Sequence, residues 1–240
     1  MNEVSKEMSS KKFYPYAHGY LTFGLLVVLL GFSTTYFSRL SNFSLPYHIH
    51  GISASLWMIL LILQPYLFQK GNLRSHRLFG WTSLVLVPLI VIFGTVMMRL
   101  MIQGQANYPP NLVYQLAFID ACTLLSFSLL YFLALYHRKR LKLHARFMVA
   151  TIFGPLLPAL ARMYFFTFGL ASNFDQALTY SYVSIELVLL LIIWKERKEK
   201  EMKLTYLPFL IFMIIQHLLM YGSDTWLWWR DFMDYFANFS

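Results

Sequence analysis

The residues best suited to chemistry are ionisable side chains that lie inside long apolar stretches of the sequence. Asp120, Arg162 and Glu186 each lie in the interior of such a stretch, and His217 lies in another. A charged group in a hydrocarbon environment costs free energy unless it is paired or hydrated, so residues of this kind are candidates for function. We therefore expect Asp120, Arg162 and Glu186 to take part directly in the chemistry of the protein.

Three histidines are candidate metal ligands in the same layer. His48 and His50 open one apolar stretch and His217 lies near the end of another. At about 1.5 Å of rise per residue, Asp120, Arg162 and Glu186 fall roughly 10–13 Å below the membrane surface at which His48 and His50 lie. Imidazoles and carboxylates bind zinc, iron and manganese. The sequence predicts a divalent metal site with these histidines as ligands, the two carboxylates as ligands or proton acceptors, and the arginine holding an anionic group.

Two features of this layer leave other interpretations open. His48 and His50 are two positions apart, so on a regular helix they point to nearly opposite sides. Both reach one ion only if residues 47–51 are non-helical, which Pro46 and Gly51 permit. In a purely structural interpretation, Asp120 and Glu186 neutralise Arg162 and tie three helices together.

A second group of histidines lies at the opposite membrane surface. His76 and His144 open two further stretches among basic residues. Two imidazoles that face one another across a helix bundle can bind haem iron axially, and neighbouring arginines can pair with the haem propionates. We therefore expect His76 and His144 to hold haem b. The alternative is a surface that binds lipid phosphates through these histidines and Arg74, Arg77, Arg138 and Arg146.

The elements that position these residues follow from composition. Of 240 residues, 58% are hydrophobic and 13% are charged, whereas soluble domains have about 45–50% and about 25%. A helix needs roughly 20 mostly apolar residues to span a bilayer. The sequence predicts an all-α integral membrane protein with about seven transmembrane helices, at residues 20–37, 50–68, 78–101, 113–135, 147–170, 177–194 and 204–221.

Charge placement predicts the orientation of these helices. The net charge is +9, but most Lys and Arg residues lie in the leader, including Lys6, Lys11 and Lys12, and in the segments 70–77, 138–146 and 195–203. Basic loops face the cytoplasm. We expect a cytoplasmic leader (1–19), one seven-helix domain (20–222) and an outer tail (223–240). The lipid bilayer, rather than nucleic acid, is then the expected partner, in a bacterial inner membrane.

Two further features modify this picture. Pro155 and Pro158 lie inside the fifth predicted helix and should kink it. Residues 224–236 contain Trp226, Trp228 and Trp229 among acidic residues. Tryptophans gather at membrane surfaces, so we expect an interfacial helix with all three indoles at the level of the lipid headgroups.

Several functions are disfavoured. Cys122 is the sole cysteine, so a disulfide framework and a thiolate metal cluster are excluded. No nucleophile stands beside a base, no glycine loop cradles phosphate, and no two histidines are four residues apart, as i, i+4 metal ligands on one helix would be. The last predicted span lacks a lysine, so a retinal Schiff base is absent there.

Taken together, several motifs resemble a group of small bacterial multi-span inner-membrane proteins without an assigned activity. The resemblance covers most of residues 45–165 and implies His, Asp and Arg around a common site. A fainter similarity is to di-haem membrane proteins of the cytochrome b type, although the fourth span has no outer histidine opposite His50. The motifs are His48-Ile-His50-Gly51, His76-Arg77-Leu-Phe-Gly80, Asp120, His144-Ala-Arg146-Phe-Met148 and Ala161-Arg162.

These observations support three hypotheses about function. The leading one is a membrane-embedded redox or metal-dependent protein that uses haem b or a metal ion and a quinol-like or lipidic substrate. The second is a non-catalytic membrane subunit, an assembly factor or a proton-coupled transporter, which works with partner subunits or through its buried charges. The third is a membrane zinc hydrolase, for which the usual histidine signals are missing.

Overall fold

A computed structural model describes residues 14–239, and this part of the chain is built from helices without strands. Six helical segments are long and apolar enough to cross a membrane, so the protein is an integral membrane protein. They are α3 (Leu45–Gln69), α4 (Leu73–Gln103), α5 (Leu112–Tyr136), α6–α7 with the π-helix that follows (Leu141–Thr167), α8 (Phe174–Lys195) and α9 with the short helix before it (Lys200–Ser223). A shorter apolar helix, α2 (Ala17–Ser33), precedes them.

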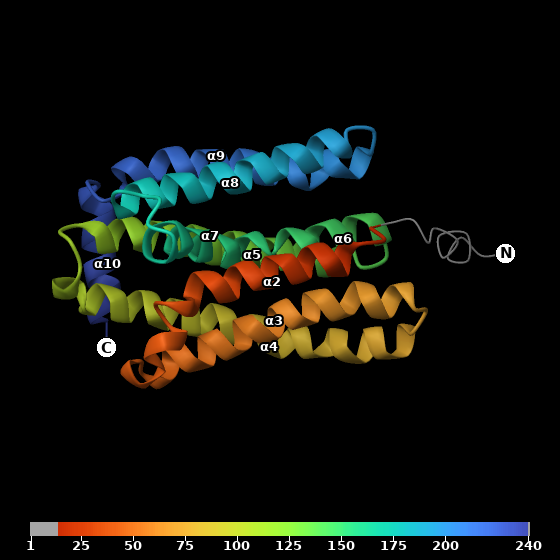
Figure 1. Cartoon of the computed structure of the whole chain (residues 1–240), viewed down its shortest axis with the longest axis horizontal. Coiled ribbons are helices and arrows are strands. Elements are labelled where there is room, and N and C mark those ends of the chain that lie inside the picture. Colours follow the sequence, from red (N-terminus) through yellow and green to blue (C-terminus); the bar gives the residue numbers. More distant parts are fainter. Residues whose placement is uncertain (1–13, 240) are drawn as a thin grey trace.

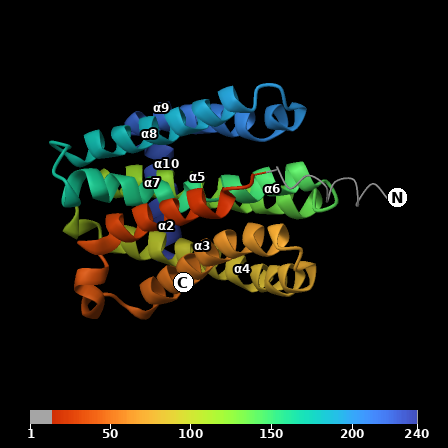
Figure 2. The same ribbon diagram turned by 45° about the vertical axis from the view of Figure 1, so that its right-hand side comes forward.

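The helices run side by side along the long axis of the bundle (Figure 1). The hairpins α3–α4 and α8–α9 flank a middle group formed by α2, α5, α6 and α7, and the view from another angle keeps this order (Figure 2). The start of α2 and the loops after α3, α5 and α8 lie at one end, which we call the basic end. We call the opposite end, which carries α10 (Leu227–Asn238), the α10 end. Of the predicted leader, residues 1–13 lie outside the described residues.

Close packing holds α2 against α7 (Phe153–Arg162). A Cβ atom added to Gly31 would lie 2.2 Å from the carbonyl oxygen of Ala159, so only glycine permits this approach of the two backbones. In the middle of the bundle, the indole of Trp57 is buried, packs edge-on against Phe127 and donates a hydrogen bond to the Thr151 hydroxyl at 3.2 Å. These small-residue and aromatic contacts fix the positions of the central helices.

The fifth membrane segment is interrupted near the prolines. It consists of α6 (Leu141–Ala150), α7 and a π-helix (Met163–Thr167). Pro155 has no N–H to donate to the Thr151 carbonyl; the Gly154 N–H contacts it instead, at 3.4 Å. Thr151 and Ile152 keep helical dihedral angles. The prolines thus interrupt the hydrogen bonding here.

The C-terminal segment differs from the expected flat anchor. Helix α10 packs against α4 and α5 and covers that end of the bundle. Trp229 is buried and its Nε1–H donates to the Tyr114 carbonyl at 2.9 Å, whereas Trp228 is exposed. The expectation that all three indoles rest among lipid headgroups is therefore wrong for Trp229. Trp229, Met233 and Ala237 recur every four residues and form one buried stripe.

Candidate functional site

The first candidate residue at the basic end, His76, is joined to α3 by a reciprocal pair of hydrogen bonds. Its Nδ1 lies 3.3 Å from the Gln64 carbonyl oxygen, and Gln64 Nε2 donates to the His76 carbonyl at 3.1 Å. A carbonyl oxygen only accepts, so Nδ1 of His76 carries the proton. Its Nε2 therefore has a lone pair that can bind a metal.

His144 is held in the same way. Its Nδ1 lies 2.8 Å from the carbonyl oxygen of Ala134, in the last turn of α5, where helix carbonyls lack partners within the helix. A histidine whose Nδ1–H binds a backbone carbonyl has its ring fixed and its Nε2 free, which is the usual arrangement of histidine metal ligands. The charge of His144 also acts on His76. The structure therefore holds both residues expected to bind haem by the same kind of bond, from an Nδ1–H to a backbone carbonyl.

Arg146, expected at the lipid phosphates, belongs to a buried ion-pair cluster instead. Its side chain is 1% exposed, and Nε lies 2.7 Å from a carboxylate oxygen of Glu196, the first residue after α8. Glu199 lies 3.7 Å from Arg146 Nη2 and 2.7 Å from Lys142 Nζ. The assignment of Arg146 to a lipid-binding surface is therefore wrong. The sequence offered no signal for this cluster, because Glu196 is fifty residues away in a run of mixed charges.

Tyr14 completes this cluster from the segment before α2. Its hydroxyl donates to Glu196 and lies 3.3 Å from the Tyr206 hydroxyl. Burial raises the pKa of Tyr14 above its usual value, and the neighbouring Tyr206 and Glu196 raise it further. For Glu199, the hydrogen bond from Lys142 lowers the pKa, with only partial opposition from burial. Tyr14 thus remains a neutral donor, while Glu199 remains charged.

His48 and His50 point away from each other. Helix α3 begins at Leu45, so residues 47–51 are helical. His48 Nδ1 lies 2.8 Å from the Tyr36 hydroxyl, whereas His50 Nδ1 donates to the Ile90 carbonyl on α4 at 3.1 Å. Burial raises the pKa of Tyr36. A single ion between the two histidines is therefore not supported, because the helical backbone separates them.

Asp120 and Arg162 lie deep in the bundle and influence each other through their charges. They form no direct ion pair, and Asp120 makes no hydrogen bond within residues 14–239. Arg162 Nη1 donates to the Pro158 carbonyl at 3.0 Å, and the guanidinium lies 4.7 Å from the centre of the Phe32 ring. Arg162 is thus bound mainly to its own helix and to α2.

Glu186 binds His217 rather than Arg162. Its Oε1 lies 2.9 Å from His217 Nδ1, across the α8–α9 interface. His217 Nε2 lies 3.3 Å from the Tyr221 hydroxyl, so both ring nitrogens have partners. The three residues therefore do not form the expected single network: Asp120 and Arg162 make one group, and Glu186 and His217 make another. His217 also lacks the free nitrogen expected of a metal ligand.

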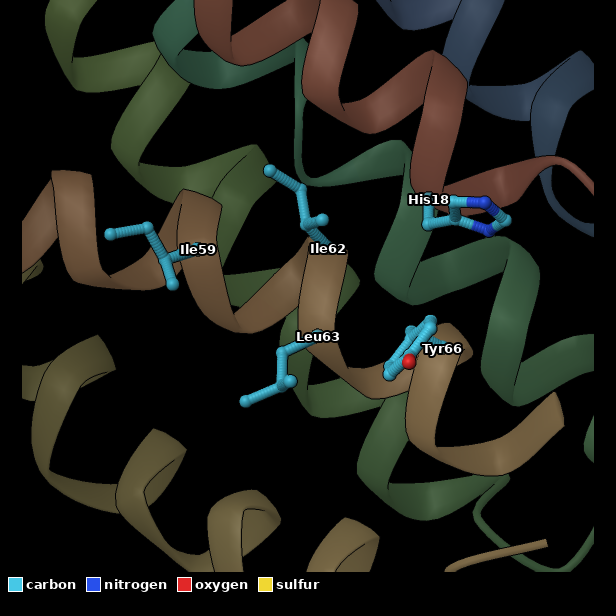
Figure 3. A pocket seen from close by; sticks show the side chains of 5 residues that line it. All are labelled: His18, Ile59, Ile62, Leu63 and Tyr66. Carbon is cyan, nitrogen blue, oxygen red and sulfur yellow. The ribbon is translucent and has the colours of Figure 1, made fainter. Parts of the chain in front are cut away.

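A crevice of about 280 Å³ lies between α2 and α3. His18 and Tyr66 stand close together at one end, and Ile62, Leu63 and Ile59 continue it along α3 (Figure 3). The ring centres of His18 and Tyr66 are 6.3 Å apart in an edge-on arrangement. His18 Nδ1 is buried and has no hydrogen-bond partner within the described part of the chain. Ile59 and Tyr66 are exposed, so the crevice opens on the surface of the bundle.

Within residues 14–239, no three His, Cys, Asp or Glu side chains come together as a group that could hold a metal ion. No protein-family model matches the chain, and no curated protein or solved structure matches it. The geometry of its own residues is therefore the basis for a proposal about function.

Proposed function

We propose that this protein is a membrane-embedded electron-transfer protein that binds haem b between His76 and His144. The observation that supports it is the shared geometry of the two histidines. Each donates Nδ1–H to a backbone carbonyl on another helix, and the two imidazoles lie close enough to interact electrostatically. Both Nε2 atoms are then free to bind iron.

The number of available ligands favours haem over a bound divalent ion. A structural or catalytic zinc site uses three or four protein ligands, and the described residues gather no such group. Haem iron takes its equatorial ligands from the porphyrin, so two axial histidines suffice. When bound, the haem would supply reversible one-electron transfer. The exposed Arg74 and Arg77 lie in the first turns of α4, and the exposed Arg138 lies in the loop after α5; all three suit the propionates.

The crevice beside His18 is the best place for a quinol-like substrate. Tyr66 and Gln64 are two residues apart on α3, so the crevice and His76 lie at similar depth on different sides of this helix. The isoleucines and leucine suit an isoprenoid tail, and the unpaired Nδ1 of His18 suits a quinol oxygen. With the basic end in the cytoplasm, as the charge distribution predicts, the crevice opens to the inner leaflet.

Optical spectra of the detergent-purified protein, oxidised and reduced with dithionite, test the proposal. Protein from haem-replete cells should show a Soret band and sharp reduced α and β bands. His76→Ala and His144→Ala should each abolish or shift them. His137→Ala is the matched control, because His137 stacks on Phe147 at the same end without a carbonyl partner for its ring. A wild-type protein that is folded and free of haem would overturn the proposal.

A second candidate is a proton-coupled transporter or membrane subunit, favoured by Asp120 and Arg162. These opposite charges lie in the membrane-spanning region, where ionisable residues often mark ion pathways and proton relays. This candidate predicts that Arg162→Met impairs folding or coupling while His76→Ala has little effect. Comparison of the two variants distinguishes it from the haem protein.

A further inference from the structure

A chain of hydrogen bonds leads from the α10 end of the bundle to the Glu186–His217 pair. The Thr179 hydroxyl lies 2.7 Å from the Tyr221 hydroxyl, which lies 3.3 Å from His217 Nε2, and His217 Nδ1 lies 2.9 Å from Glu186. Tyr221 is exposed near the end of α9, whereas the side chains of Glu186 and His217 are only 16% and 13% exposed. The chain thus connects the surface with ionisable groups inside the bundle.

The directions of these bonds indicate how many protons the pair holds. Thr179 has one hydroxyl proton and donates it to the Asp175 carbonyl at 2.9 Å. Thr179 Oγ1 must then accept from Tyr221, whose oxygen accepts in turn from His217 Nε2–H. With Nε2 protonated, the contact between Nδ1 and Glu186 requires either an imidazolium beside a carboxylate or a neutral imidazole beside a carboxylic acid. In both forms the pair carries one added proton and has no net charge.

The opposite state differs in the orientation of two hydroxyl groups and in the loss of one proton. If Thr179 donates to Tyr221, the Tyr221 hydroxyl donates to an unprotonated Nε2, and His217 donates Nδ1–H to the Glu186 carboxylate. This state holds one proton fewer and has a net charge of −1. We propose that Glu186 and His217 form a proton-binding site that exchanges its proton with the α10 end through Tyr221 and Thr179. Loading moves one proton onto Nε2, and unloading returns it by the same route without oxidation or reduction.

Tyr182 provides an independent observation at the inner side of this site. Its ring stacks on His217, with centres 4.7 Å apart and planes 8° apart. It is fully buried, yet its hydroxyl has no hydrogen-bond partner in the described chain. That hydroxyl feels the charges of Glu186 and Asp120. A water molecule beside it would extend the path towards Asp120.

Other ionisable groups surround the pair. Cys122 and Asp120 on α5 interact electrostatically with Tyr182, which stacks on His217, and the charges of Asp120 and Arg162 act on each other. A negative net charge on the unloaded pair is therefore added to a region that already holds opposite charges in balance. This inference is independent of haem binding, because no residue of the haem proposal takes part.

Carbodiimide labelling tests the site, since dicyclohexylcarbodiimide attacks protonated carboxyl groups within membranes. The full-length protein would be labelled in phosphatidylethanolamine–phosphatidylglycerol vesicles over a range of pH, with modification of Glu186 measured by mass spectrometry. We expect labelling that falls as pH rises, with a definite midpoint. Tyr221→Phe removes the hydroxyl that bonds Nε2 in both states. The bond from a cationic imidazolium is the stronger of the two, so its loss should lower that midpoint by about half a unit or more.

The control is Tyr164→Phe. This change breaks the 2.7 Å hydrogen bond between Tyr164 and Ser184, which lies on α8 as Glu186 does, and it should leave the midpoint unchanged. If Tyr221→Phe fails to fold, Thr179→Val tests the next hydrogen bond of the chain, between Thr179 and Tyr221. Labelling of Glu186 that is independent of pH would refute the proton-binding site. A midpoint that is the same in wild type and in both link variants would refute the path.

Discussion

The guanidinium of Arg146 lies 2.7 Å from the carboxylate of Glu196 and joins α6 to the loop after α8 at the basic end of the bundle. Because Arg146 is 1% exposed and Glu199 lies farther away, at 3.7 Å, removing the nearest carboxylate leaves a buried charge that is only partly compensated. Glu196→Gln should therefore lower the free energy of unfolding by up to about 3 kcal/mol.

This loss can be followed through the sole cysteine. Cys122 lies in α5, so a thiol-reactive dye reports its exposure as the protein unfolds in detergent. The double variant Arg146→Met/Glu196→Met should be more stable than Glu196→Gln alone, since neither charge then remains. Equal stability of Glu196→Gln and wild type would contradict a stabilising pair.

Gly31 and Gly19 make a matched pair on α2. At Gly31→Ala, the added Cβ meets the Ala159 backbone, and backbone cannot move aside as a flexible side chain does. We expect a loss of about 1–3 kcal/mol from overpacking. Gly19→Ala meets nothing within 4 Å and should be neutral or stabilise by up to about 1 kcal/mol through helix propensity. Similar melting temperatures for the two variants would show that α2 does not pack on α7.

The tryptophans of α10 should differ in importance. Trp229→Ala removes a buried ring and the hydrogen bond to the Tyr114 carbonyl, so it should cost about 3–5 kcal/mol. Trp228→Ala, at an exposed position, should change stability by less than about 0.5 kcal/mol. Thermal unfolding of both variants in one detergent provides the measurement. The opposite order would mean that α10 lies in the membrane surface instead of against α4 and α5.

The Glu199–Lys142 bridge should stabilise the protein only above acidic pH. The pKa of Glu199 is lower in the folded protein, so the stabilisation is present above the unfolded value, about 4.3, and is lost as pH falls through the folded value. Both side chains are well exposed, so Glu199→Gln should cost less than about 1 kcal/mol at neutral pH. The difference from wild type should vanish only once pH has fallen below the lowered pKa of the folded protein. Glu201→Gln, at a residue with no ion pair in the described chain, is the control.

Apolar stretches were sufficient to locate the membrane helices. Residues 113–135, for example, fall inside α5, because a helix is the structure that satisfies its own backbone within a bilayer. The divergence of His48 and His50 also followed from helix geometry. The stripe of Trp229, Met233 and Ala237 is also visible in the sequence, as a spacing of four residues.

The partners of the buried charges were harder to predict from the sequence. Depth in the membrane places Glu186 in one layer with both Arg162 and His217. The choice of His217 depends on how α8 turns between its neighbours α7 and α9, and a rotation about a helix axis has no local signature. The same holds for Arg146. A basic residue near a membrane surface is expected to contact lipid phosphates, and the sequence does not show that the distant Glu196 reaches it. Pairings across many residues arise only from the assembled bundle.

The position of α10 also has a consequence for the order of events during synthesis. Arg99 and Gln103, at the far end of α4, donate hydrogen bonds to the Ala237 carbonyl at 3.0 and 2.8 Å. The ribosome delivers α4 long before α10, so these two donors must remain hydrated or lipid-bound while the later helices are made. The bundle is therefore closed at this end only after residue 237 has been made, and a chain that stops earlier lacks the carbonyl that Arg99 and Gln103 bind.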